Sequence, residues 1–285
     1  MTVPFNIDLK DKTAVVTGGG GELCGCFSEA LAKCGAKVAI LDLRKEAADT
    51  VASKINENGG IAMGIEVNVL DLKSLRKAEK VIRREFGPCN ILINGAGGNH
   101  PKGTTSKEFL TVDDLESERE GLVTFFDLNQ GGIEFVFNLN FIGTFLPIQV
   151  FAKQMVNQKG AIIINISSIN AFTPLTKIPA YSGAKAAVSN FTQWLAVYFS
   201  KVGIRVNAIA PGFFLTEQNR SLLTNEDGSF TKRAKKILNQ TPIGRFGKPE
   251  ELIGTLFWLV DEKASGFVNG VIIPIDGGFS AYSGV

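Results

Sequence analysis

The feature that most limits the fold is a regular alternation of short apolar runs with longer amphipathic stretches. Strands that helices cover on both faces are apolar along their whole length, whereas a half-exposed strand alternates apolar and polar residues. The first half of the chain therefore predicts parallel strands separated by helices. The predicted strands are 13–17, 37–41, 61–67 and 90–94, and the predicted helices are 22–33, 45–58 and 71–86.

The same alternation continues to the end of the chain. It predicts helices around 135–155, from about 181–200 and near 250–260, and strands at 161–167, 204–210 and 270–276. The simplest fold is an α/β, Rossmann-type doubly wound parallel sheet of about seven strands with helices on both faces. No linker or charge block divides the chain, so we expect a single domain over residues 1–285. Ligands in such sheets bind beyond the carboxyl ends of the strands.

Charge and cysteine usage exclude several classes of function. Lys and Arg number 30 against 28 Asp and Glu, without a basic tract, so we expect no nucleic-acid partner. The chain has no basic, apolar leader and no uninterrupted apolar run of about 18 residues, so we expect no membrane partner and a cytoplasmic location. The four cysteines lack paired spacing and downstream histidines, which predicts reduced thiols and no metal site.

A glycine-rich stretch, "TGGGGELCGC", directly follows the first predicted strand. A full G-x-G-x-x-G pattern cannot be placed, because Leu23 or Cys24 stands at its last position. Gly18 to Gly21 still permit a tight turn, and the N–H groups of the next helix suit a diphosphate. Glu22 is unfavourable beside a diphosphate unless its carboxylate reaches solvent or a partner. The alternative is a turn that binds nothing.

Asp42 ends the second predicted strand, 24 residues after Gly18. A carboxylate at this position can accept hydrogen bonds from both ribose hydroxyls of an adenosine and repels a 2′-phosphate. We therefore expect NAD rather than NADP as the cofactor. Arg44 could offer a positive charge to a 2′-phosphate, which would favour NADP. Asp42 could instead cap the following helix.

Four further motifs occur in a fixed order. They are "NGAG" at 94–97, an N-x-x-G stretch at Asn140, Ser168 at a strand end, and "YSGAK" from Tyr181 to Lys185, 13 residues after that serine. With them the chain resembles the short-chain dehydrogenase/reductase family over nearly its whole length. The resemblance implies that Asn140, Ser168, Tyr181 and Lys185 are catalytic.

The family's cofactor-binding positions can also be matched. "PGFFLT" at 211–216 resembles the loop that contacts the nicotinamide, and Asn68-Val69 stands where the family has Asp-Val. The resemblance and the turn chemistry together give these expected cofactor contacts: Gly18, Gly21, Leu23, Asp42, Asn68, Val69, Asn94, Ala96, Gly97, Tyr181, Lys185, Pro211, Gly212, Phe214 and Thr216.

Elementary chemistry gives the same roles. Tyr181 and Lys185 are four apart and share a helix face. An ammonium about 4 Å from a phenol can lower its pKa by up to about three units, which would let Tyr181 exchange a proton with the substrate oxygen while Ser168 hydrogen-bonds that oxygen. We expect Lys185 to hold the nicotinamide ribose and Asn140 to interrupt its helix and anchor a water. Each residue alone could instead be an ordinary surface pair or turn residue.

Two segments are expected to determine the substrate. Between Asn94 and Asn140 the chain is about twenty residues longer than the resemblance implies, which predicts an insertion at about 99–127, and 213–240 is a candidate lid. The insertion carries His100 and Lys102, which would suit an anionic substrate. An ordinary surface insertion with a solvated histidine is the alternative.

Four stretches carry a finer pattern: "GAGGNHP" at 95–101, "SSINAFTPLTKIPAYS" at 167–182, "APGFFLTEQNR" at 210–220 and "DGGFSAYSGV" at 276–285. With them the chain resembles a subgroup of D-mannonate oxidoreductases, or fructuronate reductases. This implies reversible reduction of D-fructuronate, with a hexuronate or keto sugar acid contacting Ser168, Asn170, Tyr181 and His100. The C-terminal stretch 267–284 resembles the surface through which relatives pair, so we expect a homotetramer or homodimer. Three alternatives are a dehydrogenase of another polyol or keto-sugar, an NAD-binding regulator without turnover, and, with little support, a serine hydrolase.

Overall fold

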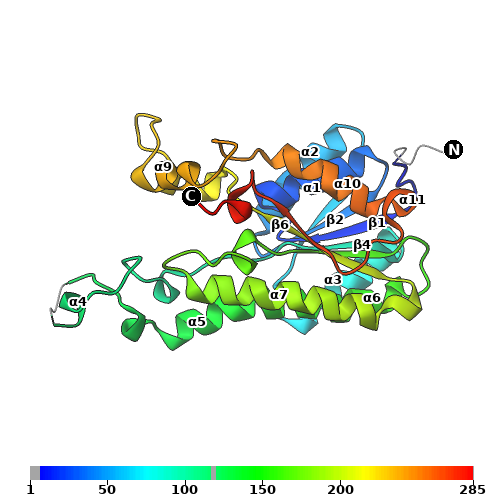
Figure 1. Ribbon diagram of the computed structural model, residues 1–285. Helices are drawn as coiled ribbons and strands as arrows, with labels where there is room; N and C mark the ends of the chain where they lie inside the picture. The colour runs from blue at the N-terminus through cyan, green and yellow to red at the C-terminus, as the bar shows by residue number, and fades with distance from the viewer. Residues whose placement is uncertain (1–6, 117–119, 285) are drawn as a thin grey trace.

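A seven-stranded parallel sheet organises the molecule (Figure 1). The computed structural model describes residues 7–116 and 120–284. The strand order is β3-β2-β1-β4-β5-β6-β7, and every pair is parallel, as the alternation predicted. The strands are β1 (Thr13–Thr17), β2 (Lys37–Asp42), β3 (Ile61–Glu66), β4 (Cys89–Asn94), β5 (Ile162–Ile166), β6 (Arg205–Pro211) and β7 (Ile272–Ile275).

Helices cover both faces of the sheet (Figure 1). One face carries α1 (Glu22–Lys33), α2 (Lys45–Glu57), α10 (Ile253–Val260) and α11 (Glu262–Ser265), and the other α3 (Leu72–Glu85), α6 (Gly143–Met155) and α7 (Pro179–Tyr198). Adjacent strand residues supply opposite cores: Val16 lies in the first cluster and Val15 in the second. Burial on both faces explains why the strands are uninterrupted apolar runs.

The predicted helix around 135–155 begins earlier and is not continuous. α5 (Gln130–Phe137) begins after Asn129, whose side chain accepts a hydrogen bond from Gly132 N. A single turn of π-helix over Asn138–Ile142 then joins α5 to α6. Pro147 lies about one turn further along, in α6. Because proline has no N–H, one hydrogen bond of the helix is missing there as well. The turn of π-helix contains Asn140, which confirms that the helix is interrupted there.

The helical segment 130–155 is long and apolar enough to cross a membrane by length and composition alone, with a mean hydropathy of 1.5. In the fold it packs against β4, α3 and α7, and 44% of its most apolar window is buried. These contacts identify it as a core helix.

Two excursions project from one end of the molecule, where α4 and α9 lie on opposite sides of the sheet (Figure 1). The first contains the short helices 101–103 and 125–127 and α4 (Asp113–Glu116), and residues 117–119 of the predicted insertion lie outside the described part. The second contains α8 (Glu217–Leu223) and α9 (Lys232–Asn239). They follow β4 and β6, so both extend from the carboxyl ends of strands. Single-turn helices at 169–171, 200–202, 249–252 and 279–281 complete the fold.

Candidate active site

The glycine-rich turn fits closely between its neighbours. Gly18 has a φ of +63°, and a Cβ there would lie 2.9 Å from the backbone N of Ala96. A Cβ at Gly20 would lie 2.7 Å from that of Ala47 and 3.0 Å from Asp42 Oδ2. The turn therefore contacts the loop after β4 on one side and the end of β2 on the other. Side chains at these two glycines would clash with the neighbouring backbone and side chains, so the turn can pack this closely only with glycine.

The Asp42 carboxylate is bonded to this turn. Its Oδ2 accepts a hydrogen bond from Gly20 N at 3.1 Å, and its Oδ1 accepts one from Arg44 N at 3.0 Å. Arg44, not Asp42, is the residue that precedes α2, so the structure does not favour the helix-cap alternative. Helix α1 begins at Glu22 without a side-chain cap, so its first N–H groups are suited to a diphosphate. These features together fit an NAD-type cofactor.

Lys185, Asn140 and Gly97 lie together beside the turn. Lys185 is 4% exposed and donates from Nζ to the Ile166 carbonyl at 2.8 Å. Asn140 is fully buried, donates from Nδ2 to the carbonyls of Gly98 and Val136, and accepts from Gly98 N. A Cβ at Gly97 would lie 2.7 Å from Asn140 Oδ1 and 3.2 Å from Lys185 Nζ. The two side chains thus face the same backbone segment.

Tyr181 and Ser168 also lie together, but their electrostatics differ from the expectation. Burial raises the pKa of Tyr181, and the interaction with the Ser168 hydroxyl lowers it less. The expected lowering by Lys185 is wrong for the protein alone. Lys185 Nζ is 5.7 Å from the centre of the Tyr181 ring and is bonded to Ile166, and burial lowers the pKa of Lys185 from 10.5 to about 8.

The other residues near the catalytic helix are placed as follows. Ser168 Oγ accepts a hydrogen bond from Asn170 N at 3.2 Å, and both residues are buried. Ser167 faces elsewhere, since its hydroxyl bonds to Ser189 at 2.6 Å. His100 Nδ1 accepts from Lys102 N, and its ring packs on Phe135 with centroids 5.0 Å apart. His100 therefore shapes its own loop, and among the described residues no hydrogen bond joins it to Ser167 or Ser168, as a hydrolase would need.

Several predicted cofactor residues have structural contacts of their own. Asn94 is buried and donates from Nδ2 to Asn165 Oδ1 on β5, so its amide ties strands together. Asn68 Oδ1 accepts from Leu70 N in a turn. Val69 is buried, and Leu23 packs partly buried against the core.

The loop after β6 is fixed by close packing. A Cβ at Gly212 would lie 2.6 Å from Asp276, next to Pro211 at the strand end. Phe214 is buried in the core, so its ring does not face the crevice and only its backbone is left for a cofactor. Thr216 precedes α8, and its N–H donates to Asn219 Oδ1. All of the predicted cofactor contacts, those of Gly21, Gly97 and this loop included, remain predictions.

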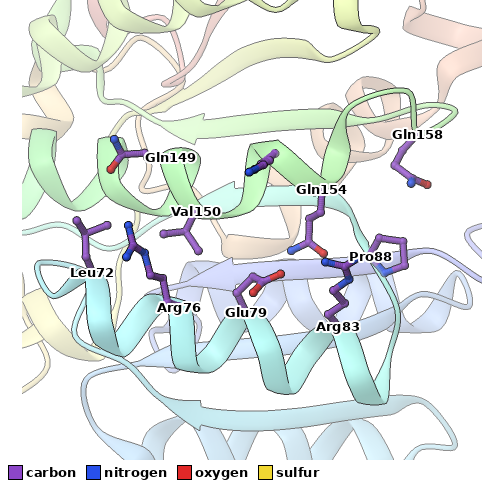
Figure 2. A pocket seen from close by; sticks show the side chains of 10 residues that line it. Leu72, Arg76, Glu79, Arg83, Pro88, Gln149, Val150, Gln154 and Gln158 are labelled. Carbon is purple, nitrogen blue, oxygen red and sulfur yellow. The ribbon is translucent and has the colours of Figure 1, made fainter.

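A groove of about 740 Å³ lies away from this site, between α3 and α6 (Figure 2). Its lining includes Arg76, Arg83 and Gln154, and Pro88 at the amino end of β4. It contains none of the predicted site residues, and it extends to the amino ends of the strands, away from the carboxyl ends where those residues lie. We therefore do not regard it as the active site.

Three long-range contacts around the crevice were not predicted. Glu22 Oε2 accepts a hydrogen bond from Glu217 N at 2.9 Å, and Lys236 on α9 pairs with Glu108 of the insertion. Thr105 N donates to the carbonyl of Lys177, which has a φ of +74°. For Glu22 a signal did exist, because its place beside a diphosphate predicted that its carboxylate reaches solvent or a partner; the residue is exposed and also bonds to Glu217 N.

Comparison with known proteins places this geometry in a family. The short chain dehydrogenase profile matches residues 12–227. The chain belongs to the short-chain dehydrogenase family. It is therefore an oxidoreductase of a family that uses NAD(P).

Two relatives and one solved structure extend over the whole dehydrogenase. An "Uncharacterized oxidoreductase" of Haemophilus influenzae is 59% identical and covers 100% of this chain and 99% of its own length. The "Uncharacterized oxidoreductase UxuB" of Bacillus subtilis is 51% identical over 99% of this chain and 100% of its own. A Haemophilus structure with bound NAD, described provisionally as a D-mannonate oxidoreductase, has a TM-score of 0.93 and 59% identity, with 98% of each chain covered.

Proposed function

We propose that this short-chain dehydrogenase is an NAD-dependent oxidoreductase of sugar acids that interconverts D-fructuronate and D-mannonate. The observation that carries the proposal is the juxtaposition of Ser168, Tyr181 and Lys185 beside the turn that Asp42 holds. The NAD-bound relative with a TM-score of 0.93 supports both the cofactor and the substrate class.

The proposed chemistry divides among three side chains and the cofactor. A bound nicotinamide supplies or accepts the hydride. Tyr181 donates a proton to the substrate oxygen during reduction and accepts it during oxidation, and Ser168 hydrogen-bonds that oxygen. Lys185 holds the nicotinamide ribose.

Two features of the protein alone bear on these roles. The Tyr181 pKa is raised, so the charges of the bound cofactor and Lys185 must lower it in the working enzyme. Asn140 holds Gly98 by hydrogen bonds in both directions and would anchor the water that joins Lys185 to solvent.

The choice of NAD over NADP rests on Asp42. Its carboxylate would repel a 2′-phosphate, and Arg44 lies 4.0 Å from it, so the positive charge of Arg44 is partly balanced. At the same position, the Asp42 carboxylate would accept hydrogen bonds from the hydroxyls of the adenosine ribose. A higher catalytic efficiency with NADPH than with NADH would contradict this assignment.

An anionic substrate is supported by basic side chains near the carboxyl ends of the strands. Lys102 lies in the insertion two residues after His100, and Lys177, which precedes α7, accepts a hydrogen bond from Thr105 of the insertion at its main-chain carbonyl. A carboxylate of a hexuronate would be attracted to such a rim. His100 and Asn170 remain the proposed substrate contacts beside Ser168 and Tyr181.

The direct test is turnover with purified protein. NADH absorbance should fall when D-fructuronate is added, and NAD should be reduced with D-mannonate. Keto-gluconates and neutral polyols, assayed in parallel, distinguish a dehydrogenase of another keto-sugar. Tight NADH binding with no turnover on the whole panel would favour the regulator instead.

We also propose that the enzyme is a cytoplasmic homotetramer or homodimer. On α7, Trp194, Val197 and Tyr198 are 55%, 77% and 65% exposed, and Phe267 is fully exposed before β7. The exposed apolar side chains grouped on α7 favour pairing of copies. Trp194→Asp should shift the mass in light scattering toward the monomer, and a monomeric wild type would contradict the proposal.

The four free cysteines are consistent with a reducing compartment.

A further inference from the structure

Glu22 occupies an unusual position for an acidic residue. It is the first residue of α1, directly after the glycine-rich turn, where a diphosphate would approach. Its side chain reaches Glu217 N, 195 residues away, at 2.9 Å. The Glu217 carboxylate is paired with Arg220 at 2.8 Å, so the two acids do not face each other without a counter-charge. Glu22 thus joins the cofactor turn to the first residue of α8.

The helices α8 and α9 depend on few polar contacts with the body. They pack around a small cluster of their own, formed by Leu223, Ala234, Ile237 and Phe246, separate from the two main cores. Within the part of the chain that the structure describes, one side-chain hydrogen bond and one ion pair join α8 and α9 to segments outside 213–247: Glu22 to Glu217, and Glu108 to Lys236. One contact starts from the cofactor turn and the other from the insertion.

We propose that Glu22 is a positioning residue that couples occupation of the cofactor turn to docking of the lid, residues 213–240. The inference rests on the proposed function for the identity of the cofactor and the substrate. A diphosphate at the turn repels the Glu22 carboxylate, and the Glu217 N–H offers that carboxylate a donor on the lid. Cofactor binding and lid docking therefore favour each other.

This coupling has a distinctive consequence for binding. Glu22→Ala removes both the repulsion of the diphosphate and the hold on the lid. NADH affinity should stay the same or increase, whereas the substrate KM should rise about tenfold, since a hydrogen bond to a charged group is lost. If Glu22 only stabilised the start of α1, the variant would bind NADH more weakly and would melt at a lower temperature.

Limited proteolysis gives a readout that needs no turnover. The lid contains trypsin sites at Arg220, Lys232, Arg233, Lys235 and Lys236. We expect NADH to slow cleavage at these sites in the wild type, and this protection to disappear in Glu22→Ala although the variant still binds NADH by fluorescence titration. Glu22→Gln keeps a neutral acceptor and should retain part of the protection, which also guards against loss of folding in the alanine variant.

Glu108→Gln is the matched control. It weakens the other attachment of the lid, so cleavage should be faster with and without NADH while the protection ratio stays that of the wild type. Equal protection by NADH in the wild type and Glu22→Ala would overturn the proposal, as would a wild-type lid that NADH does not protect. Failure of the proposed function is distinct, because it appears as no turnover of the sugar acids while the proteolytic difference persists.

Discussion

The two sides of the crevice are built in different ways. On the cofactor side, Asn140 and Lys185 are buried, and their side chains bond to main-chain carbonyls of neighbouring elements. On the proposed substrate side, the insertion and the candidate lid meet through an ion pair between Glu108 and Lys236, and the candidate lid packs around its own small cluster. Both sides extend from carboxyl ends of the same sheet.

The difference indicates how the enzyme divides its tasks. Groups that exchange protons need fixed positions, which burial and main-chain hydrogen bonds provide. Groups that admit and release substrate need contacts that can break at small cost, and exposed ion pairs provide those. Substitutions on the cofactor side should therefore change chemistry or stability strongly, and substitutions on the substrate side should change KM modestly.

The largest effect is expected for Tyr181→Phe. Loss of the hydroxyl removes proton transfer, so kcat should fall about a thousandfold. NADH affinity, measured by fluorescence titration, should stay within about threefold because the ring still fills its place. If the variant kept most of its turnover, Tyr181 would not be the proton donor.

Lys185→Met should inactivate the enzyme and also stabilise it. Burial lowers the Lys185 pKa from 10.5 to about 8, so the unfolded chain holds this proton more tightly than the folded one. The resulting penalty on folding is fully present below pH 8 and is relieved as pH rises from 8 toward 10.5. At pH 7 the free energy of unfolding of the variant, measured by urea denaturation, should therefore exceed that of the wild type by about 2 kcal/mol.

The same measurement across pH provides the control. The stability advantage of Lys185→Met over the wild type should shrink between pH 8 and 10. An advantage that stays constant over this range would mean that the Lys185 ammonium is not destabilised by burial.

A smaller effect is expected at Asp42, at the edge of the cofactor side. Asp42→Ser removes the charge that opposes a 2′-phosphate, so the ratio of kcat/KM for NADPH to that for NADH should rise at least about tenfold. Both cofactors should be titrated with saturating substrate. An unchanged ratio would show that Asp42 only shapes the glycine-rich turn through Gly20.

The smallest effect is expected on the substrate side. Glu108→Gln weakens an exposed pair, so the substrate KM should change by about twofold or threefold, with kcat and the melting temperature nearly unchanged. Lys236→Gln should have the same effect, and the double variant should add little to either. A large fall in kcat in these variants would remove the distinction between the two sides.

Local patterns predicted most of the fold. Apolar runs such as Thr13–Thr17 gave all seven strands, and Glu22–Lys33 was predicted with its observed bounds because the glycines before it and the amphipathic stretch mark them. The start of α5 was missed, since its cap Asn129 and the turn of π-helix at Asn140 do not follow from apolar spacing. The electrostatics of Tyr181 failed for a related reason: spacing placed Lys185 on the right face but could not reveal its bond to Ile166.

Contacts between segments that are distant in the sequence could not be predicted from it. Glu22 needed a partner, but nothing near it in the sequence identified Glu217. The pair between Glu108 and Lys236 joins two segments, the insertion and the candidate lid, that share no periodicity, and the sequence also could not show that His100 Nδ1 accepts a hydrogen bond from Lys102 N. Such contacts depend on the tertiary arrangement at the end of the sheet, which only the three-dimensional structure provides.

The central claim is that Tyr181 and Ser168 face the reactive carbon of a bound nicotinamide. A crystal structure of the dehydrogenase with NAD and D-mannonate tests it most directly. The account predicts that both hydroxyls hydrogen-bond the substrate oxygen to be oxidised, with Lys185 on the nicotinamide ribose. A nicotinamide ring bound elsewhere, or a substrate oxygen beyond hydrogen-bond reach of Tyr181, would contradict it.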